Sequence, residues 1–134
     1  MNFNQIIGDQ ITGISVLLYD DKIHSACIEE ILITLSTSKF FIAVNSEYDE
    51  IILKINNECQ LKIQDDNYRI IDIKDSSENI LHNLVNKKIC WIWTLNNNQG
   101  YDDALQLEVS LNEENEKYQF LAIASKLDIY RLTK

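Results

Sequence analysis

The stretch Leu105-Gln106-Leu107-Glu108-Val109-Ser110-Leu111 decides the fold class, because apolar and polar residues alternate along all of it. That period buries one face of a β-strand and leaves the other face in water. Shorter segments with the same alternation occur on both sides of it, at residues 14–18, 31–35, 40–44, 51–55, 61–63, 71–73, 91–95, 120–122 and 127–132. The chain is therefore predicted to be mostly β-strand.

Clusters of Asn, Asp and Ser separate these segments and take the place of the usual glycine and proline turns. The chain has three glycines and no proline. Asn and Asp tolerate left-handed backbone and bond to their own main chain, so they suit tight turns. Short strands with such turns at intervals of about ten residues predict an antiparallel meander, a curled sheet or a barrel.

Residues 76–86 depart from the alternation and predict a helix. The stretch Asp75-Ser76-Ser77-Glu78 is similar to a capping box, in which the two acidic side chains bond to backbone amides at the start of a helix. An apolar stripe at helical spacing follows, made by Ile80, Leu81, Leu84 and Val85. The predicted fold is α+β: predominantly antiparallel β, with one helix near residues 76–86 packed on it. The first ten residues could add a short helix.

Length and charge limit the classes of function. The 134 residues fit one domain, 1–134. A formal net charge of -9 argues against binding to a nucleic-acid backbone or an anionic membrane, and it suits a basic partner. No apolar run is long enough to span a membrane. The first ten residues lack the features of a secretory signal, so we expect a cytoplasmic protein.

No motif for catalysis, metal binding or phosphate binding is recognisable. The cysteines Cys27, Cys59 and Cys90 lie about thirty residues apart, without the spacing of a zinc site. His24 and His82 each stand alone, and the adjacent acidic pairs lie mostly in turns. We predict no catalytic residue, no metal and no cofactor. An enzyme that uses unmarked acidic residues is the weakest alternative, and it needs them gathered in one cleft.

The most distinctive segment runs from Cys90 to Asp103 and contains both tryptophans. Trp91 and Trp93 fall on one face of a strand, which favours a buried core position; the alternative is an exposed patch for a partner. An Asn-rich hairpin loop ending at Gly100 then places Tyr101 and two carboxylates on the rim of the domain.

This segment resembles a family of small bacterial proteins that forms a domain of unknown function. The shared pattern W-x-W-x-x-N-x-x-G-Y-x-D is carried by Trp91, Trp93, Asn96 or Asn97, Gly100, Tyr101 and Asp103. The resemblance implies no activity and no catalytic residues. In size and acidity the chain is also similar to immunity proteins, which neutralise bacterial toxins.

Three hypotheses about function follow. The first is a non-enzymatic protein-binding module, concretely an immunity-type inhibitor of a basic toxin, which predicts a contiguous acidic surface beside exposed aromatics. Its candidate contact residues are Asp20, Asp21, Tyr48, Asp49, Trp91, Trp93, Tyr101, Asp102 and Asp103. The second is a small-ligand-binding sheet or barrel with Trp91, Trp93 and Phe120 lining its pocket. The third is the enzyme with unmarked acids.

Overall fold

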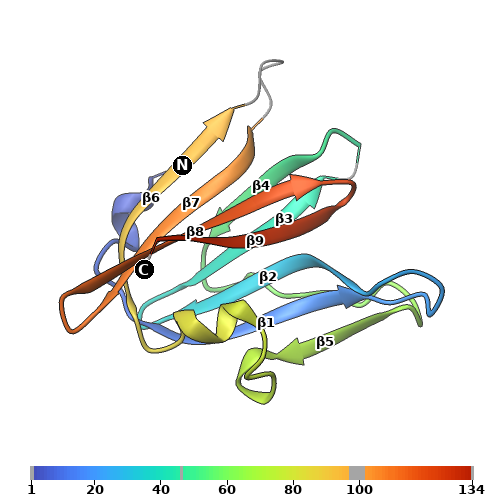
Figure 1. Cartoon of the computed structure of the whole chain (residues 1–134), viewed down its shortest axis with the longest axis horizontal. Helices are drawn as coiled ribbons and strands as arrows, with labels where there is room; N and C mark the ends of the chain where they lie inside the picture. The colour runs from blue at the N-terminus through green and yellow to red at the C-terminus, as the bar shows by residue number, and fades with distance from the viewer. Residues whose placement is uncertain (1, 46, 97–101, 134) are drawn as a thin grey trace.

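The computed structural model describes residues 2–45, 47–96 and 102–133 and shows two antiparallel sheets facing each other (Figure 1). The first sheet has the order β4-β3-β2-β1-β5. Its strands are β1 (Ile11–Tyr19), β2 (Cys27–Leu35), β3 (Lys39–Asn45), β4 (Glu50–Ile55) and β5 (Tyr68–Asp72). The second has the order β6-β7-β8-β9, with β6 (Lys88–Asn96), β7 (Asp102–Leu111), β8 (Glu114–Ile123) and β9 (Lys126–Thr133). The predicted antiparallel β architecture is confirmed, and neither sheet closes into a barrel.

Two hairpins of the second sheet turn on residues with left-handed backbone. Asn112 and Glu113 have φ of 53° and 70°, and Ala124 and Ser125 have φ of 52° and 65°. Two consecutive positive φ angles are typical of a two-residue turn whose twist matches that of the flanking strands. The tight turns fix the register of β7, β8 and β9.

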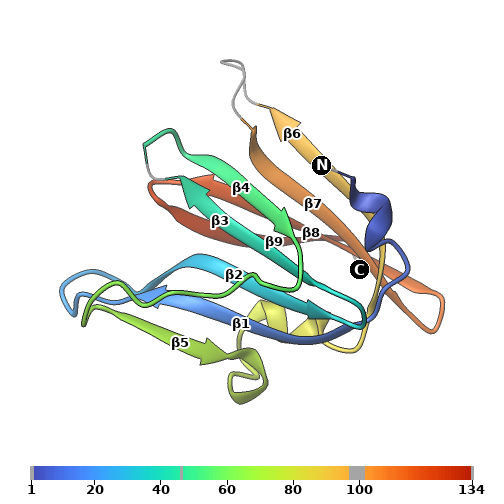
Figure 2. The same ribbon diagram turned by 180° about the vertical axis from the view of Figure 1, so that it is seen from behind.

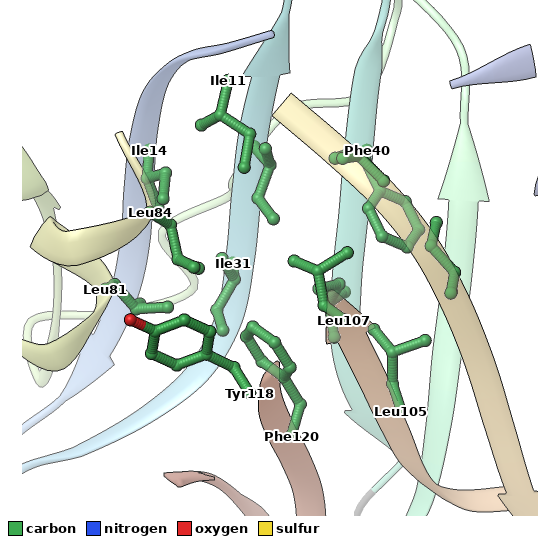
Figure 3. Packing of buried hydrophobic residues seen from close by; sticks show 14 of the residues in the cluster. Ile11, Ile14, Ile31, Phe40, Leu81, Leu84, Leu105, Leu107, Tyr118 and Phe120 are labelled. Atoms are coloured by element: carbon green, nitrogen blue, oxygen red, sulfur yellow. The ribbon is translucent and has the colours of Figure 1, made fainter. Parts of the chain in front are cut away.

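The hydrophobic core lies between the two sheets. Leu105 and Leu107 point into it from β7 and meet the fully buried rings of Tyr118 and Phe120 (Figure 3). Val109 is buried in the same cluster, as the alternation predicts. The first sheet contributes the buried residues Ile11, Ile14, Ile31, Ile33, Phe40 and Ile42. The alternation does not carry through to Leu111, which is 47% exposed at the end of its strand.

The helix predicted at residues 76–86 is wrong, because the described residues contain no α-helix. Instead, two 3-10 turns occur, η2 (Ile73–Asp75) and η3 (Ile80–Leu84). Each turn has its own cap: Asp72 accepts from the Lys74 amide, and Asn79 from the Leu81 amide. Each cap begins a separate short turn, and Asp75 ends the first of them. The capping box predicted at residues 75–78 therefore does not form.

Three residues per turn also suit the packing of η3. In a 3-10 helix the side chains at i and i+3 lie one above the other. Leu81 and Leu84 stand in that relation, and both are fully buried against the core (Figure 3). Ile80 and Val85 stay partly exposed. The apolar stripe is therefore real, but one short turn is enough to bury it.

The strand predicted at residues 61–63 is also wrong. The connection from β4 to β5 crosses the outer face of the first sheet (Figure 2). There Cys59 and Leu61 pack on Phe41 and Ala43 in a second, smaller apolar cluster. The apolar residues of this connection thus serve as a cover and not as a strand.

The N-terminal segment begins with a 3-10 turn, η1 (Phe3–Gln5), which is the short helix expected there. The Phe3 ring lies edge-on to that of Phe40, with centroids 6.2 Å apart, and so joins the core. No helix in the described part of the chain has the length and apolar character that a membrane span requires.

Candidate functional site

The residues predicted to contact a partner fall in separate places. Asp20 and Asp21 lie in the β1–β2 loop, Tyr48 and Asp49 in the β3–β4 turn, and the pair 102–103 at the start of β7. Tyr101 lies outside the described residues. Asp49 has a structural task, since its Oδ1 accepts the Ser125 amide at 3.0 Å and joins two hairpin turns.

Both tryptophans lie on the outer face of the second sheet, so the predicted core position is wrong. Trp91 is 48% exposed and Trp93 is 37% exposed. The cause is a β-bulge between Ile89 and Trp91, which inserts one residue and reverses the alternation. Ile89 and Ile92 consequently face the core, and the indoles face solvent.

The outer face around the tryptophans is a regular array. The two indole rings meet edge to face with centroids 6.2 Å apart, and Lys117 Nζ lies 5.3 Å from the centroid of the Trp93 ring. Trp93, Gln106, Gln119 and Tyr130 form one row across all four strands. Gln106 donates to Gln119 within that row at 3.0 Å. This row of four residues has an aromatic side chain at each end and two uncharged glutamines between them.

The pocket residues proposed for a small ligand do not come together. Phe120 is fully buried between the sheets, on the opposite face of the second sheet from the tryptophans. A pocket of about 280 Å³ does open between the edges of the two sheets. It is lined by Phe3, Ile51, Leu53, Thr94, Asp102 and Ala104.

A second group of aromatic and acidic residues forms where β1 ends and β5 begins. The register of these strands pairs Tyr19 with Tyr68, and the two rings lie 5.1 Å apart. The Asp20 amide donates to the Asn67 carbonyl at 2.8 Å, which ties the β1–β2 loop to the turn before β5 (Figures 1 and 2). We call this group the acidic-tyrosine surface; its members are Tyr19, Asp20, Asp21, Glu29, Asp65, Asp66 and Tyr68.

Hydrogen bonds and burial perturb the ionisation of this surface. The Tyr68 hydroxyl donates to Glu29 Oε1 at 3.2 Å. Partial burial raises the pKa of Tyr68 to about 12, and the negative charges of Glu29 and Asp65 add to the effect. Burial also raises the pKa of Tyr19, again with help from nearby carboxylates including Asp21. The carboxylates therefore act together on both phenols.

Hydrogen bonds within the β1–β2 loop stabilise the charged form of Asp21. It accepts hydrogen bonds from the backbone amides of Ile23 and His24, and its Oδ2 lies 3.0 Å from His24 Nδ1. The bonds from His24, backbone and ring, are the main reason that the pKa of Asp21 falls to about 2. This carboxylate is therefore ionised at any physiological pH.

The opposing charges at this surface are few. Arg69 lies 3.8 Å from Asp20, and Lys22 is in the same loop. Within the described residues, no three side chains of His, Cys, Asp or Glu form a group able to hold a metal ion. His82 lies in η3, away from the His24 loop (Figure 1). The arrangement can therefore bind a basic protein surface, because it presents carboxylates together with two tyrosine rings.

Removing the charge of Glu29 is expected to bring the pKa of Tyr68 down from about 12 toward 10. The Glu29→Gln variant keeps a hydrogen-bond acceptor and loses the charge, and NMR titration of labelled tyrosines reads the pKa. Glu30→Gln is the control, since Glu30 is not among the charges acting on Tyr68. Because the pKa of Tyr68 is higher in the folded protein than its usual value, this residue stabilises the fold below about pH 10, and the contribution is lost as the pH rises from about 10 to about 12. An unchanged pKa in Glu29→Gln would contradict the assigned cause.

Five members of the acidic-tyrosine surface are not among the residues predicted from the sequence: Tyr19, Glu29, Asp65, Asp66 and Tyr68. One signal for them exists, because Tyr19-Asp20-Asp21 and Asp65-Asp66-Asn67-Tyr68 are nearly mirror images. Because β1 and β5 pair in antiparallel fashion, the two tyrosines lie side by side and the acidic residues of both segments lie at the same end of the strands. That signal has meaning only when β5 is known to pair with β1.

One family model matches the chain, over residues 1–134, and it is described as a family of unknown function, DUF6334. The resemblance to a domain-of-unknown-function family is thereby confirmed. Comparison with curated proteins and with solved structures found no match.

Proposed function

Since this chain belongs to DUF6334, a family of unknown function, we propose its function from its own surfaces: it is a non-enzymatic protein-binding module for a basic partner. The observation that carries the proposal is the acidic-tyrosine surface. It joins carboxylates from β2, the β1–β2 loop and the turn before β5 around the Tyr19–Tyr68 pair.

The chemistry of this surface suits a protein partner. Tyrosine is enriched in binding hot spots because its ring buries apolar area while its hydroxyl bonds to polar groups. The two rings are held by their strands, so little side-chain freedom is lost on binding. The surrounding carboxylates attract a basic surface from a distance and speed its association.

An immunity-type inhibitor of a basic toxin fits these properties best. Such an inhibitor must reach its toxin quickly and hold it, and strong charge complementarity serves the first need. The net charge of -9 attracts a basic protein from a distance. The acidic-tyrosine surface is where several of the negative charges lie together. A toxin encoded by the neighbouring gene is the partner to test first, by co-expression and rescue of growth.

Charge removal at the acidic-tyrosine surface is expected to slow association with that toxin about tenfold or more at low salt. The test variant is Asp21→Asn, Asp65→Asn and Asp66→Asn, because asparagine keeps the side-chain oxygen that caps each loop. The control is Asp75→Asn, Glu78→Gln and Glu113→Gln, three exposed acids elsewhere on the molecule. Surface plasmon resonance at 50 mM and 1 M salt measures the association rates.

The two triple variants carry the same net charge, so a difference between them reports the location of the binding surface. At 1 M salt the Debye length is about 3 Å, and the rates of all three proteins should converge. Equal slowing by both triples would mean that overall charge, and not this surface, attracts the partner. Full rescue of growth by the test variant would contradict the proposed role of the surface.

A further inference from the structure

The free edge of β6 differs from the other three sheet edges. Natural edge strands carry charges, prolines or covering segments that prevent pairing with another chain. Strands β4, β5 and β9 each carry at least one basic and one acidic residue. Residues 91–96 of β6, Trp-Ile-Trp-Thr-Leu-Asn, have no charge and no proline.

Only the first part of the β6 edge is covered. Residues 8–11 lie along it: the Ile89 amide donates to the Asp9 carbonyl at 2.9 Å, and the Ile89 carbonyl accepts from the Gly8 amide at 2.7 Å. Gln10 pairs with Lys88 in an isolated bridge. Beyond this point, no backbone of the described residues other than β7 bonds to residues 91–96.

The direction of the free backbone groups follows from the register. Both backbone groups of Ile89 point toward the covering segment, and in an antiparallel strand such outward residues alternate. The bulge adds one residue, so the next outward residues are Ile92 and then Thr94. Their N–H and C=O groups face away from β7 and offer a template for another strand.

Side-chain sites lie on both faces of this template. On the outer face, Trp91 and Trp93 stand exposed beside the edge. On the inner face, Thr94 and Asp102 line the pocket of about 280 Å³ between the sheet edges. Alternate side chains of an added strand would therefore meet an indole surface on one side and a pocket with a carboxylate on the other.

We propose that the β6 edge binds an extended segment of a partner protein as an additional strand of the second sheet. The segment has small apolar or β-branched residues at alternate positions and a basic residue that reaches Asp102. The charge argues for another protein and against a second copy, since two copies of a chain of net charge -9 repel each other. The proposal does not depend on the acidic-tyrosine surface, which lies on the other sheet.

A labelled eight-residue peptide of alternating valine and threonine, with lysine at both ends, tests the proposal. Fluorescence anisotropy is expected to show binding that is at least tenfold tighter than for the same peptide with glutamate at both ends. Thr94→Pro removes an outward N–H, which an edge strand tolerates, and is expected to abolish binding. Thr94→Val keeps that N–H and is expected to bind like the parent protein.

Amide hydrogen exchange in the parent protein provides a second measurement that needs no variant. Without peptide, the Ile92 and Thr94 amides should exchange fast and those of Trp91 and Trp93 slowly; the peptide should protect the first pair. The proposal is overturned if neither peptide binds, if Thr94→Pro binds as well as Thr94→Val, or if protection grows with protein concentration alone. The last result would identify a second copy as the occupant. None of these results bears on binding at the acidic-tyrosine surface.

Discussion

Replacing Phe120 with alanine is expected to lower the free energy of unfolding by about 3–5 kcal/mol, whereas Trp93→Ala should lower it by about 1–2 kcal/mol. Both positions hold a large aromatic side chain in the second sheet. Phe120 is fully buried, so its loss leaves a cavity between the two sheets (Figure 3). Trp93 loses mainly its contacts with the Trp91 ring and with Lys117.

Urea denaturation followed by far-ultraviolet circular dichroism gives both values under the same conditions. Phe120→Leu serves as an intermediate, since it keeps most of the apolar volume and should cost less than Phe120→Ala. A loss for Trp93→Ala as large as that for Phe120→Ala would mean that the indole is buried. The proposed strand-addition edge would then lose its outer contact surface.

Much of the fold could be predicted because a strand with one buried face has apolar residues at every second position. In β7, Leu105, Leu107 and Val109 are buried as the alternation requires. The same rule fails at the tryptophans, because a bulge changes the phase without changing the composition. Ile89, Trp91 and Trp93 look like one face in the sequence, but the structure places the isoleucine inside and the indoles outside.

The error at residues 76–86 has a different origin. Propensity and an apolar stripe indicate a helical turn, and a helical turn is present. Its length is decided by tertiary packing, since burial of Leu81 and Leu84 needs only one turn. Acceptors that cap short turns, such as Asn79, are also found at the start of long helices. Local sequence therefore does not distinguish the two outcomes.

The candidate site depended on strand order, which sequence patterns do not reveal. Asp20 and Asp21 could be predicted to lie in a turn, and the structure places them in the β1–β2 loop, where both are half-buried. Their neighbours Tyr68 and Asp65 lie in β5 and in the turn before it, and β5 joins the opposite side of β1 after a long connection. The nearly mirror-image order of tyrosine and acids becomes a shared surface only through that pairing.

The ion group around Glu116 ties three parts of the second sheet together. Its carboxylate pairs with Lys87, at the entry to β6, and with Arg131 in β9. The side chains of Glu116 and Lys87 are only 13% and 16% exposed. Removing one partner leaves a largely buried charge without compensation, which is far more costly than losing a surface pair.

Glu116→Gln is therefore expected to lower the free energy of unfolding by about 2–3 kcal/mol at pH 7, with the loss shrinking toward pH 3. Burial alone would raise the pKa of Glu116, but the hydrogen bond and charge of Lys87, with Arg131, outweigh it and hold the pKa below its usual value. A depressed carboxyl pKa stabilises the fold above about pH 4.3, and this contribution fades as pH falls through the folded-state value.

The matched control is Glu114→Gln, two residues earlier on the same strand and exposed. It removes the same charge from the same chain and should change stability by less than about 0.5 kcal/mol at either pH. Urea unfolding at pH 7 and pH 3 measures all three proteins. If Glu116→Gln cost as much at pH 3 as at pH 7, packing of the side chain and not its charge would hold β6 to β9. If it cost nothing at pH 7, the pairs with Lys87 and Arg131 would not hold these strands together.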